Sequence, residues 1–119
     1  MKIKTVKYGS LILLIENFDD RTILEWNGES NDKRPSEMLM PFFKNFIKRL
    51  DKILVIKFDK LEYMNSSTIH PLILFIKKLN EKNIKTDIIY NKNSKWQKVS
   101  FEAMKNLTKV LKNITVQAI

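Results

Sequence analysis

The chain has 119 residues, 44% of them hydrophobic and 29% charged, which is the composition of one globular domain and not of a disordered chain. It contains no cysteine, so disulfides, thiol catalysis and thiolate metal sites are excluded. The longest apolar runs, residues 11–15 and 71–76, are too short to cross a membrane, and the N-terminus lacks the apolar stretch of a signal peptide. We therefore expect a cytoplasmic protein with no membrane insertion.

The net charge is +9, which is compatible with an anionic partner. The cations are nearly all lysines, spread singly or in pairs, and the only arginines are Arg21, Arg34 and Arg49. Base recognition favours the forked guanidinium group over the point-like ammonium. We read the charge mainly as solvated surface, and keep a lysine-rich nucleic-acid or anionic-surface binding domain as the alternative.

The N-terminal half predicts three strands and a helix. Residues 3–8 alternate apolar and polar side chains, residues 11–15 are continuously apolar, and residues 22–26 alternate again, with turn residues such as Gly9 and Asp19 between them. These strands should form an antiparallel meander, followed by a loop over residues 27–35. Apolar residues at helical spacing then predict a helix between Met38 and Leu50.

The C-terminal half alternates strands and helices. Residues 53–58, 84–90 and 114–119 predict strands. The second helix has a buried stripe made of Ile69, Leu72, Ile73, Ile76 and Leu79, and with Thr68 as its cap Pro71 would fall in the first turn. The third helix follows Asn91–Ser94, and its predicted shared face consists of Trp96, Val99, Ala103, Leu107, Val110 and Leu111.

This order, a β-meander followed by αβαβαβ, predicts a single-domain α/β sandwich over residues 1–119 with a mixed sheet. Strands separated by helices should pair in parallel.

The join between the strand at residues 53–58 and the second helix contains four consecutive small polar residues, Asn65, Ser66, Ser67 and Thr68. Such side chains satisfy the unpaired N–H groups that open a helix. The same position favours negative charge, so a phosphoryl group on Ser66 or Ser67 would meet backbone donors and the positive end of the helix dipole. The segment is therefore either a helix cap and nothing more, or a candidate switch.

Enzymatic signatures are missing from the sequence. Gly9 and Gly28 are the only glycines, so a glycine-rich phosphate loop is excluded. His70 is the sole histidine, and we interpret it as a partly exposed residue of the first helical turn, without an acid placed to orient it for catalysis. We expect no catalytic residues, no metal site and no cofactor.

At residues 65–68 the chain resembles the STAS domain of bacterial anti-sigma-factor antagonists. In that family an apolar strand runs into an Asp-Ser-Ser-Gly or Asp-Thr-Ser-Gly signature at the start of a helix, and Asn65-Ser66-Ser67-Thr68-Ile69 occupies this place. The Asn-Thr-Ser-Ser-Ile pattern of SiaC-type regulatory phosphoproteins is closer still. Here Asn65 replaces the usual Asp, and Thr68 replaces the Gly. The element order is similar to STAS from about residue 4 to residue 116.

The resemblance implies a non-catalytic signalling switch. Its phosphorylated hydroxyl would be Ser66, with Ser67 and Thr68 as alternates and one of these two as the helix cap. Asn65, Ser66, Ser67, Thr68 and His70 would form the partner-binding surface. The implied partners are a GHKL-type serine kinase or anti-sigma factor, a PP2C-like phosphatase, and a client such as a diguanylate cyclase or another signalling enzyme. A STAS-like interaction or sensor module that is never phosphorylated is a further alternative.

Overall fold

The computed structural model describes residues 2–119, which form seven strands and three helices. The strands are β1 (Lys2–Tyr8), β2 (Leu11–Asn17), β3 (Arg21–Ser30), β4 (Ile53–Lys57), β5 (Leu61–Met64), β6 (Thr86–Tyr90) and β7 (Ile114–Ala118). The helices are α1 (Ser36–Lys48), α2 (Ser66–Glu81) and α3 (Lys95–Thr108). No helix in this described part of the chain is long and apolar enough to cross a membrane.

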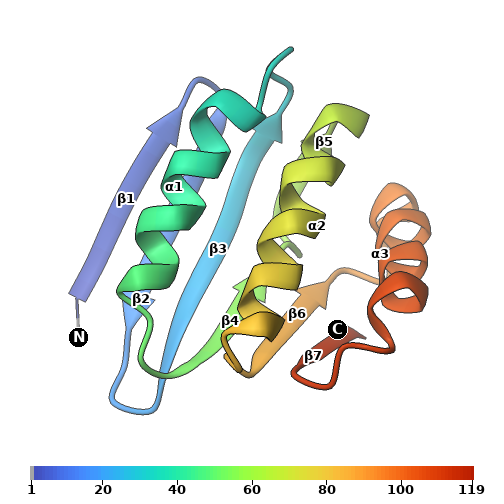
Figure 1. Ribbon diagram of the computed structural model, residues 1–119. Coiled ribbons are helices and arrows are strands. Elements are labelled where there is room, and N and C mark those ends of the chain that lie inside the picture. The colour runs from blue at the N-terminus through green and yellow to red at the C-terminus, as the bar shows by residue number, and fades with distance from the viewer. Residues whose placement is uncertain (1) are drawn as a thin grey trace.

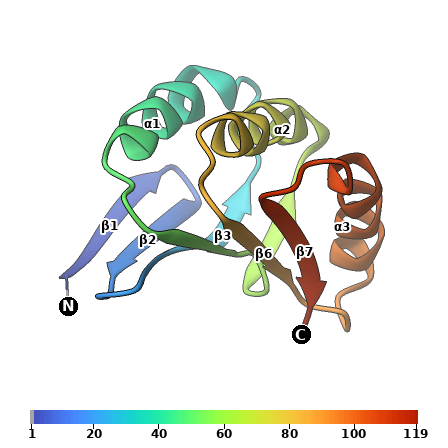
Figure 2. The ribbon, with the colours of Figure 1, turned by 60° about the horizontal axis from the view of Figure 1, so that its bottom comes forward.

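All strands belong to one mixed sheet, ordered β1-β2-β3-β4-β6-β7, with β5 paired to β3 off this path. The first three strands form an antiparallel meander, and the pairings β3–β4, β4–β6 and β6–β7 are parallel. In Figures 1 and 2, α1 and α2 lie side by side over one face of the sheet, and α3 lies beside β7. The predicted α/β sandwich with a mixed sheet is confirmed.

The core lies between the sheet and the helices, and aromatic rings fill its centre. Phe43 of α1 stacks on Phe75 of α2 with ring centroids 4.0 Å apart, and Trp26 of β3 packs on both Phe43 and Phe58. Phe58 continues the contact to Phe101 of α3. Since all five side chains are almost fully buried, the three helices share a single hydrophobic core with the sheet.

Strand β3 is longer than predicted, since it continues through residues 27–30, which the sequence assigns to a loop. Gly28 explains the extension: its φ is +77°, and a Cβ atom built on it would lie 2.1 Å from the carbonyl oxygen of Ser10. Only glycine permits this close approach of the β1–β2 turn, which accepts a hydrogen bond from the Glu29 N–H. Beyond a register shift at Gly28, the end of β3 pairs with β5, a four-residue strand that the sequence analysis missed.

The prediction for the inner face of α3 holds only for Trp96 and Leu111, which are half-buried against the core, and is wrong for its other residues. The buried residues are Gln97, Phe101, Met104 and Thr108, whereas Val99, Leu107 and Val110 are 69%, 66% and 80% exposed. For α2 the predicted stripe is correct in Leu72, Ile76 and Leu79, which are buried, while Ile69 and Ile73 are half-buried. The cause of the α3 error is Gln97, a polar residue that is buried in the core.

Candidate functional site

The start of α2 is capped by Asn65. Its backbone is extended, and its side-chain oxygen accepts hydrogen bonds from the N–H and from the hydroxyl of Thr68, at 3.1 and 2.7 Å. Its amide nitrogen donates to the carbonyl oxygen of Asp32 at 2.7 Å, and its backbone N–H donates to the carbonyl oxygen of Ser30 at 2.9 Å. Asn65 therefore fixes the first turn of α2 to the end of β3 and the loop that follows it.

Thr68 and Ser30 form the buried side of this cap. Their hydroxyl oxygens are 2.7 Å apart, and both residues are at most 1% exposed. Since the Asn65 oxygen can only accept, the Thr68 hydroxyl donates to it, and the Ser30 hydroxyl must then donate to Thr68. The result is a directed chain from Ser30 through Thr68 to Asn65, which we call the cap network.

The prediction that Ser67 or Thr68 caps the helix is therefore wrong. Asn65 is the cap, because its side-chain oxygen accepts a hydrogen bond from the N–H of Thr68, which is the third residue of the helix. The helix begins at Ser66, so Pro71 is its sixth residue and lies beyond the first turn. Pro71 is buried in the interface that α2 makes with the core.

Ser66 and Ser67 are the first two residues of α2, and both are exposed. Within residues 2–119 neither hydroxyl is engaged in a hydrogen bond, and no acceptor pairs with the N–H of either residue. The side chains are therefore accessible, and two backbone donors point out of the positive end of the helix. Thr68 differs, because its hydroxyl is sealed inside the protein and is not accessible for modification.

His70 is exposed, but it is the fifth residue of α2 and lies beyond the first turn in which it was predicted. Tyr63, on β5 just before the cap, is 47% exposed. Exposed tyrosines next to a loop are frequent anchors of protein interfaces. Tyr63 carries no periodic signal in the sequence, because β5 has only four residues. Ser30 and Asp32 could not be predicted either, since they are more than 30 residues away in sequence and carry no local signal of their contacts with Asn65 and Thr68.

We expect Asn65→Ala to lower the free energy of unfolding by about 1–2 kcal/mol, because it removes the cap and leaves the Thr68 hydroxyl without its acceptor. Ser94→Ala is the matched control: Ser94 precedes α3 at the same position, but its side chain makes no capping hydrogen bond. Its effect should stay within about 0.5 kcal/mol. Urea unfolding of both variants measures the difference, and equal losses would show that the Asn65 contacts contribute no more than a half-buried serine without a capping bond.

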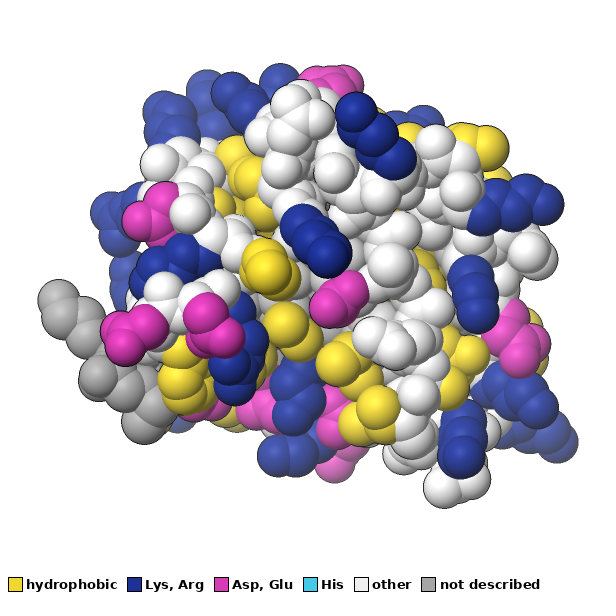
Figure 3. Space-filling model, turned by 90° about the horizontal axis from the view of Figure 1, so that it is seen from below, with side chains coloured by type: hydrophobic (Ala, Val, Ile, Leu, Met, Phe, Trp, Pro, Cys, Tyr) yellow, Lys and Arg dark blue, Asp and Glu magenta, His cyan; other side chains and the backbone are white. Residues whose placement is uncertain are grey.

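The face of the molecule seen from below has no block of like charge: in Figure 3, lysine and arginine side chains are spread among acidic, apolar and uncharged polar side chains. Within residues 2–119, no three acidic or histidine side chains come together as metal ligands. The start of α2 is therefore the candidate site, and the chemistry it offers is an accessible hydroxyl beside free backbone donors.

No protein-family model and no curated protein matches the chain in sequence. Several solved structures are similar in fold. An anti-sigma factor antagonist from Mycobacterium paratuberculosis superposes with a TM-score of 0.59 at 16% identity, covering 97% of this chain and 85% of that one. The anti-sigma factor antagonist SpoIIAA in its unphosphorylated form gives 0.59 at 11% identity, with coverage of 88% and 87%.

The third similar structure is an uncharacterised protein from Shewanella loihica with a SpoIIAA-like fold. It gives a TM-score of 0.58 at 12% identity, with coverage of 98% of this chain and 90% of that one. All three likenesses extend over nearly the whole of both chains, so they concern the complete sheet and its helices. The chain therefore has the STAS fold of the SpoIIAA-like anti-sigma factor antagonists.

Proposed function

We propose that this protein is a non-catalytic signalling switch of the anti-sigma-factor-antagonist type, and that reversible phosphorylation of Ser66 controls its binding to a protein partner. The observation that supports the proposal is that the residue that caps α2 and the exposed hydroxyl at its start are different residues. Asn65 supplies the cap, so the exposed hydroxyl of Ser66 has no structural task. Ser66 also takes the place of the modified hydroxyl in the STAS signature.

A phosphoryl group on Ser66 is compatible with the fold. It adds a charge of about −1.5 to −2 next to the free N–H groups of the first turn. The interaction with the helix end is favourable by about 1 kcal/mol. Phosphorylation should therefore leave the domain folded and act at the interface, where a new anionic group is costly to desolvate or meets like charge.

The two departures from the STAS signature agree with the geometry. An Asp at position 65 would set a carboxylate oxygen against the Asp32 carbonyl oxygen, which now accepts from the Asn65 amide at 2.7 Å. Asn65 is uncharged, so it also adds no repulsion to a phosphoryl group on the neighbouring residue. At position 68, the buried threonine hydroxyl completes the cap network, which a glycine could not do.

In this scheme a serine kinase of the GHKL type, which can itself be the anti-sigma factor, modifies Ser66, and a PP2C-like phosphatase restores the hydroxyl. The unmodified form binds its client, an anti-sigma factor, a diguanylate cyclase or another signalling enzyme, through Asn65, Ser66, Ser67 and His70. Tyr63, on the adjacent strand β5, extends the same exposed surface.

The test is phosphopeptide mass spectrometry of the protein purified from its native cells. The affinity for the partner protein that co-purifies with it is then measured. We expect phosphate on Ser66. Ser66→Ala should bind the partner constitutively, and Ser66→Asp should bind it at least about tenfold more weakly, since an anionic group enters the interface. Both variants should change the free energy of unfolding by no more than about 1 kcal/mol.

Ser94→Asp provides the control, because it adds the same charge at the N-terminus of a different helix. Its partner affinity should equal that of the unmodified protein. Phosphate found only at Ser67 or elsewhere would contradict the assignment of Ser66. A protein that carries no phosphate under any growth condition would favour the unphosphorylated interaction module.

A further inference from the structure

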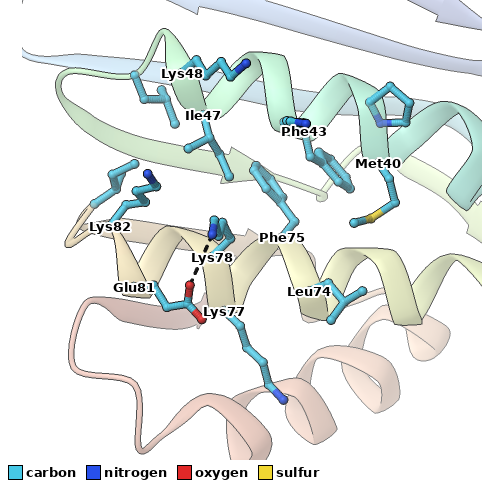
Figure 4. Close-up of a pocket in the computed structure, with 14 residues that line it drawn as sticks. Met40, Phe43, Ile47, Lys48, Leu74, Phe75, Lys77, Lys78, Glu81 and Lys82 are labelled. Carbon is cyan, nitrogen blue, oxygen red and sulfur yellow. Dashed lines mark ion pairs between the residues drawn. The ribbon is translucent and has the colours of Figure 1, made fainter.

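A groove of about 1160 Å³ lies between the C-terminal halves of α1 and α2, on the helical face of the protein (Figure 4). On the α2 side its lining begins at Leu74, eight residues after Ser66, which corresponds to about 12 Å along the helix. It is thus separate from the switch site, and the proposed function makes no use of it.

The floor and walls of the groove are apolar. The stacked rings of Phe43 and Phe75 form the floor, and Ile47 extends it toward the end of α1. Met40 and Leu74 stand above the floor on opposite helices and are 36% and 39% exposed. These side chains leave apolar surface in contact with solvent between two rims of charged groups, a shape that the apolar face of an amphipathic helix can fill.

The rim is basic on both sides. Lys44 and Lys48 lie one turn apart on α1, and Lys78 and Lys82 lie one turn apart along α2 and its C-terminal end. All four are exposed, and the only acid in the lining, Glu81, is paired with Lys78 at 3.5 Å. A fifth lysine, Lys77, points away from α1 in Figure 4.

The apolar floor and the two basic rims favour one kind of ligand for the groove. A trough between two helices that run in the same direction (Figure 1) accommodates a third helix, whose apolar face lies on the floor and whose flanks face the two rims. A fatty acid carries one carboxylate and would leave most of the four rim lysines unpaired, and a flat membrane cannot enter a concave floor. A second copy of this chain is disfavoured by charge, because α3, its most exposed amphipathic helix, carries Lys95, Lys98 and Lys105 against Glu102 alone.

We infer that the α1–α2 groove binds an amphipathic helix of a partner protein, with apolar residues at i, i+3, i+4 and i+7 and acidic residues on both flanks. The partner helix covers Met40, Leu74, Phe43 and Phe75, and its carboxylates face the lysines of the rim. This surface gives the protein a second point of attachment, which a change at Ser66 does not alter.

The test uses a synthetic peptide of about 15 residues, with leucines at that spacing and glutamates on both flanks, titrated into the full chain and followed by backbone amide NMR. We expect shifts confined to the groove residues of α1 and α2. The same peptide with lysines in place of the glutamates should cause none. Absence of localised shifts up to about 1 mM peptide, where even millimolar dissociation constants are visible, would overturn the inference.

Matched variants test the two parts of the recognition separately. The double variant Lys48→Glu with Lys82→Glu should weaken the acidic peptide at least about tenfold. Lys98→Glu with Lys105→Glu, the same charge change on α3, should weaken it less than about twofold, the small effect expected from net charge alone. Met40→Ala with Leu74→Ala should also weaken binding, and both side chains are exposed enough for the fold to survive.

Equal effects of the two lysine pairs would mean that the peptide senses net charge only, and the groove would not be its site. Displacement of the peptide by palmitate at equal concentration would show that the groove is a lipid site, which also contradicts the inference. Ser66→Asp should leave peptide binding unchanged, so a failure here is distinguishable from a failure of the phosphorylation switch.

Discussion

Gly28→Ala is expected to lower the free energy of unfolding by about 3 kcal/mol, the largest single-residue effect we predict for the backbone. Two causes add: an alanine at φ +77° carries a conformational cost of about 1–2 kcal/mol. Its Cβ would also lie 2.1 Å from the Ser10 carbonyl oxygen, a backbone atom that cannot move aside without shifting the β1–β2 turn, at a further cost of about 1–3 kcal/mol. Thermal unfolding should show a decrease in Tm of about 10 °C.

Gly9 separates the two causes, because its φ is +60° but nothing lies within 4 Å of a Cβ built on it. Gly9→Ala should therefore lose only about 1–2 kcal/mol. Asparagine tolerates positive φ, so Gly9→Asn should be close to neutral while Gly28→Asn remains severely destabilised. If Gly9→Ala and Gly28→Ala were equally stable, the close approach of the Ser10 carbonyl would have no energetic weight.

Thr68→Val should cost about 2–3 kcal/mol, although it preserves the shape of the side chain. The substitution removes the hydroxyl that joins Ser30 to Asn65, and it leaves the Ser30 hydroxyl buried without an acceptor. Urea unfolding measures the loss in the free energy of unfolding. The affinity for the proposed partner should also decrease, since a loosened first turn displaces Ser66.

A double-mutant cycle with Ser30→Ala identifies the origin of this loss. Since Ser30 and Thr68 share one buried hydrogen bond, the two substitutions together should cost less than the sum of the single losses, by about 1 kcal/mol. Additive losses would mean that the two hydroxyls act independently. Ser66→Ala should change stability by less than about 0.5 kcal/mol, which distinguishes the exposed hydroxyl from the buried ones.

The fold could be predicted in outline because each long element carries its own periodic signal. The strands of the meander alternate apolar and polar residues, and the helices repeat apolar residues every three or four positions. Strand β5 escaped because it has only four residues, of which the outer two, Leu61 and Met64, are buried. The end of β3, which pairs with β5, could not be predicted either, since glycine and serine, here Gly28 and Ser30, are typical of turns.

The inner face of α3 shows why periodicity alone fails where a polar side chain has a structural task. Gln97 is 1% exposed, and its amide nitrogen donates to the carbonyl oxygens of Phe58 and Leu61, while its oxygen accepts from the N–H of Asn91. These bonds satisfy the backbone at the β4–β5 connection and turn α3 so that Phe101 faces the core. The more apolar stripe, including Val99 and Leu107, is left in solvent.

The candidate site was predicted in its position and in the exposure of Ser66, but not in its construction. A run of four polar residues before an apolar helix indicates a capped helix start, yet it does not indicate which residue caps. That choice depends on Ser30 and Asp32, which reach the site only through the pairing of β3 with β5. Phosphorylation of Ser66 stays a prediction from the resemblance and from the accessibility of its hydroxyl.

Pro71 has a consequence for how an enzyme could reach Ser66. It has no N–H to donate to the carbonyl group of Ser67, so the opening turn of α2 lacks one of the bonds that tie it to the rest of the helix. Unwinding residues 66–68 therefore breaks one backbone hydrogen bond fewer than in an ordinary helix, in addition to the side-chain contacts of Asn65 and Thr68, and the helix beyond Pro71 is held by the buried Leu72 and Phe75. For the proposed phosphorylation of Ser66, a kinase that needs an extended acceptor peptide would have to unwind only this turn, while the rest of the domain remains folded.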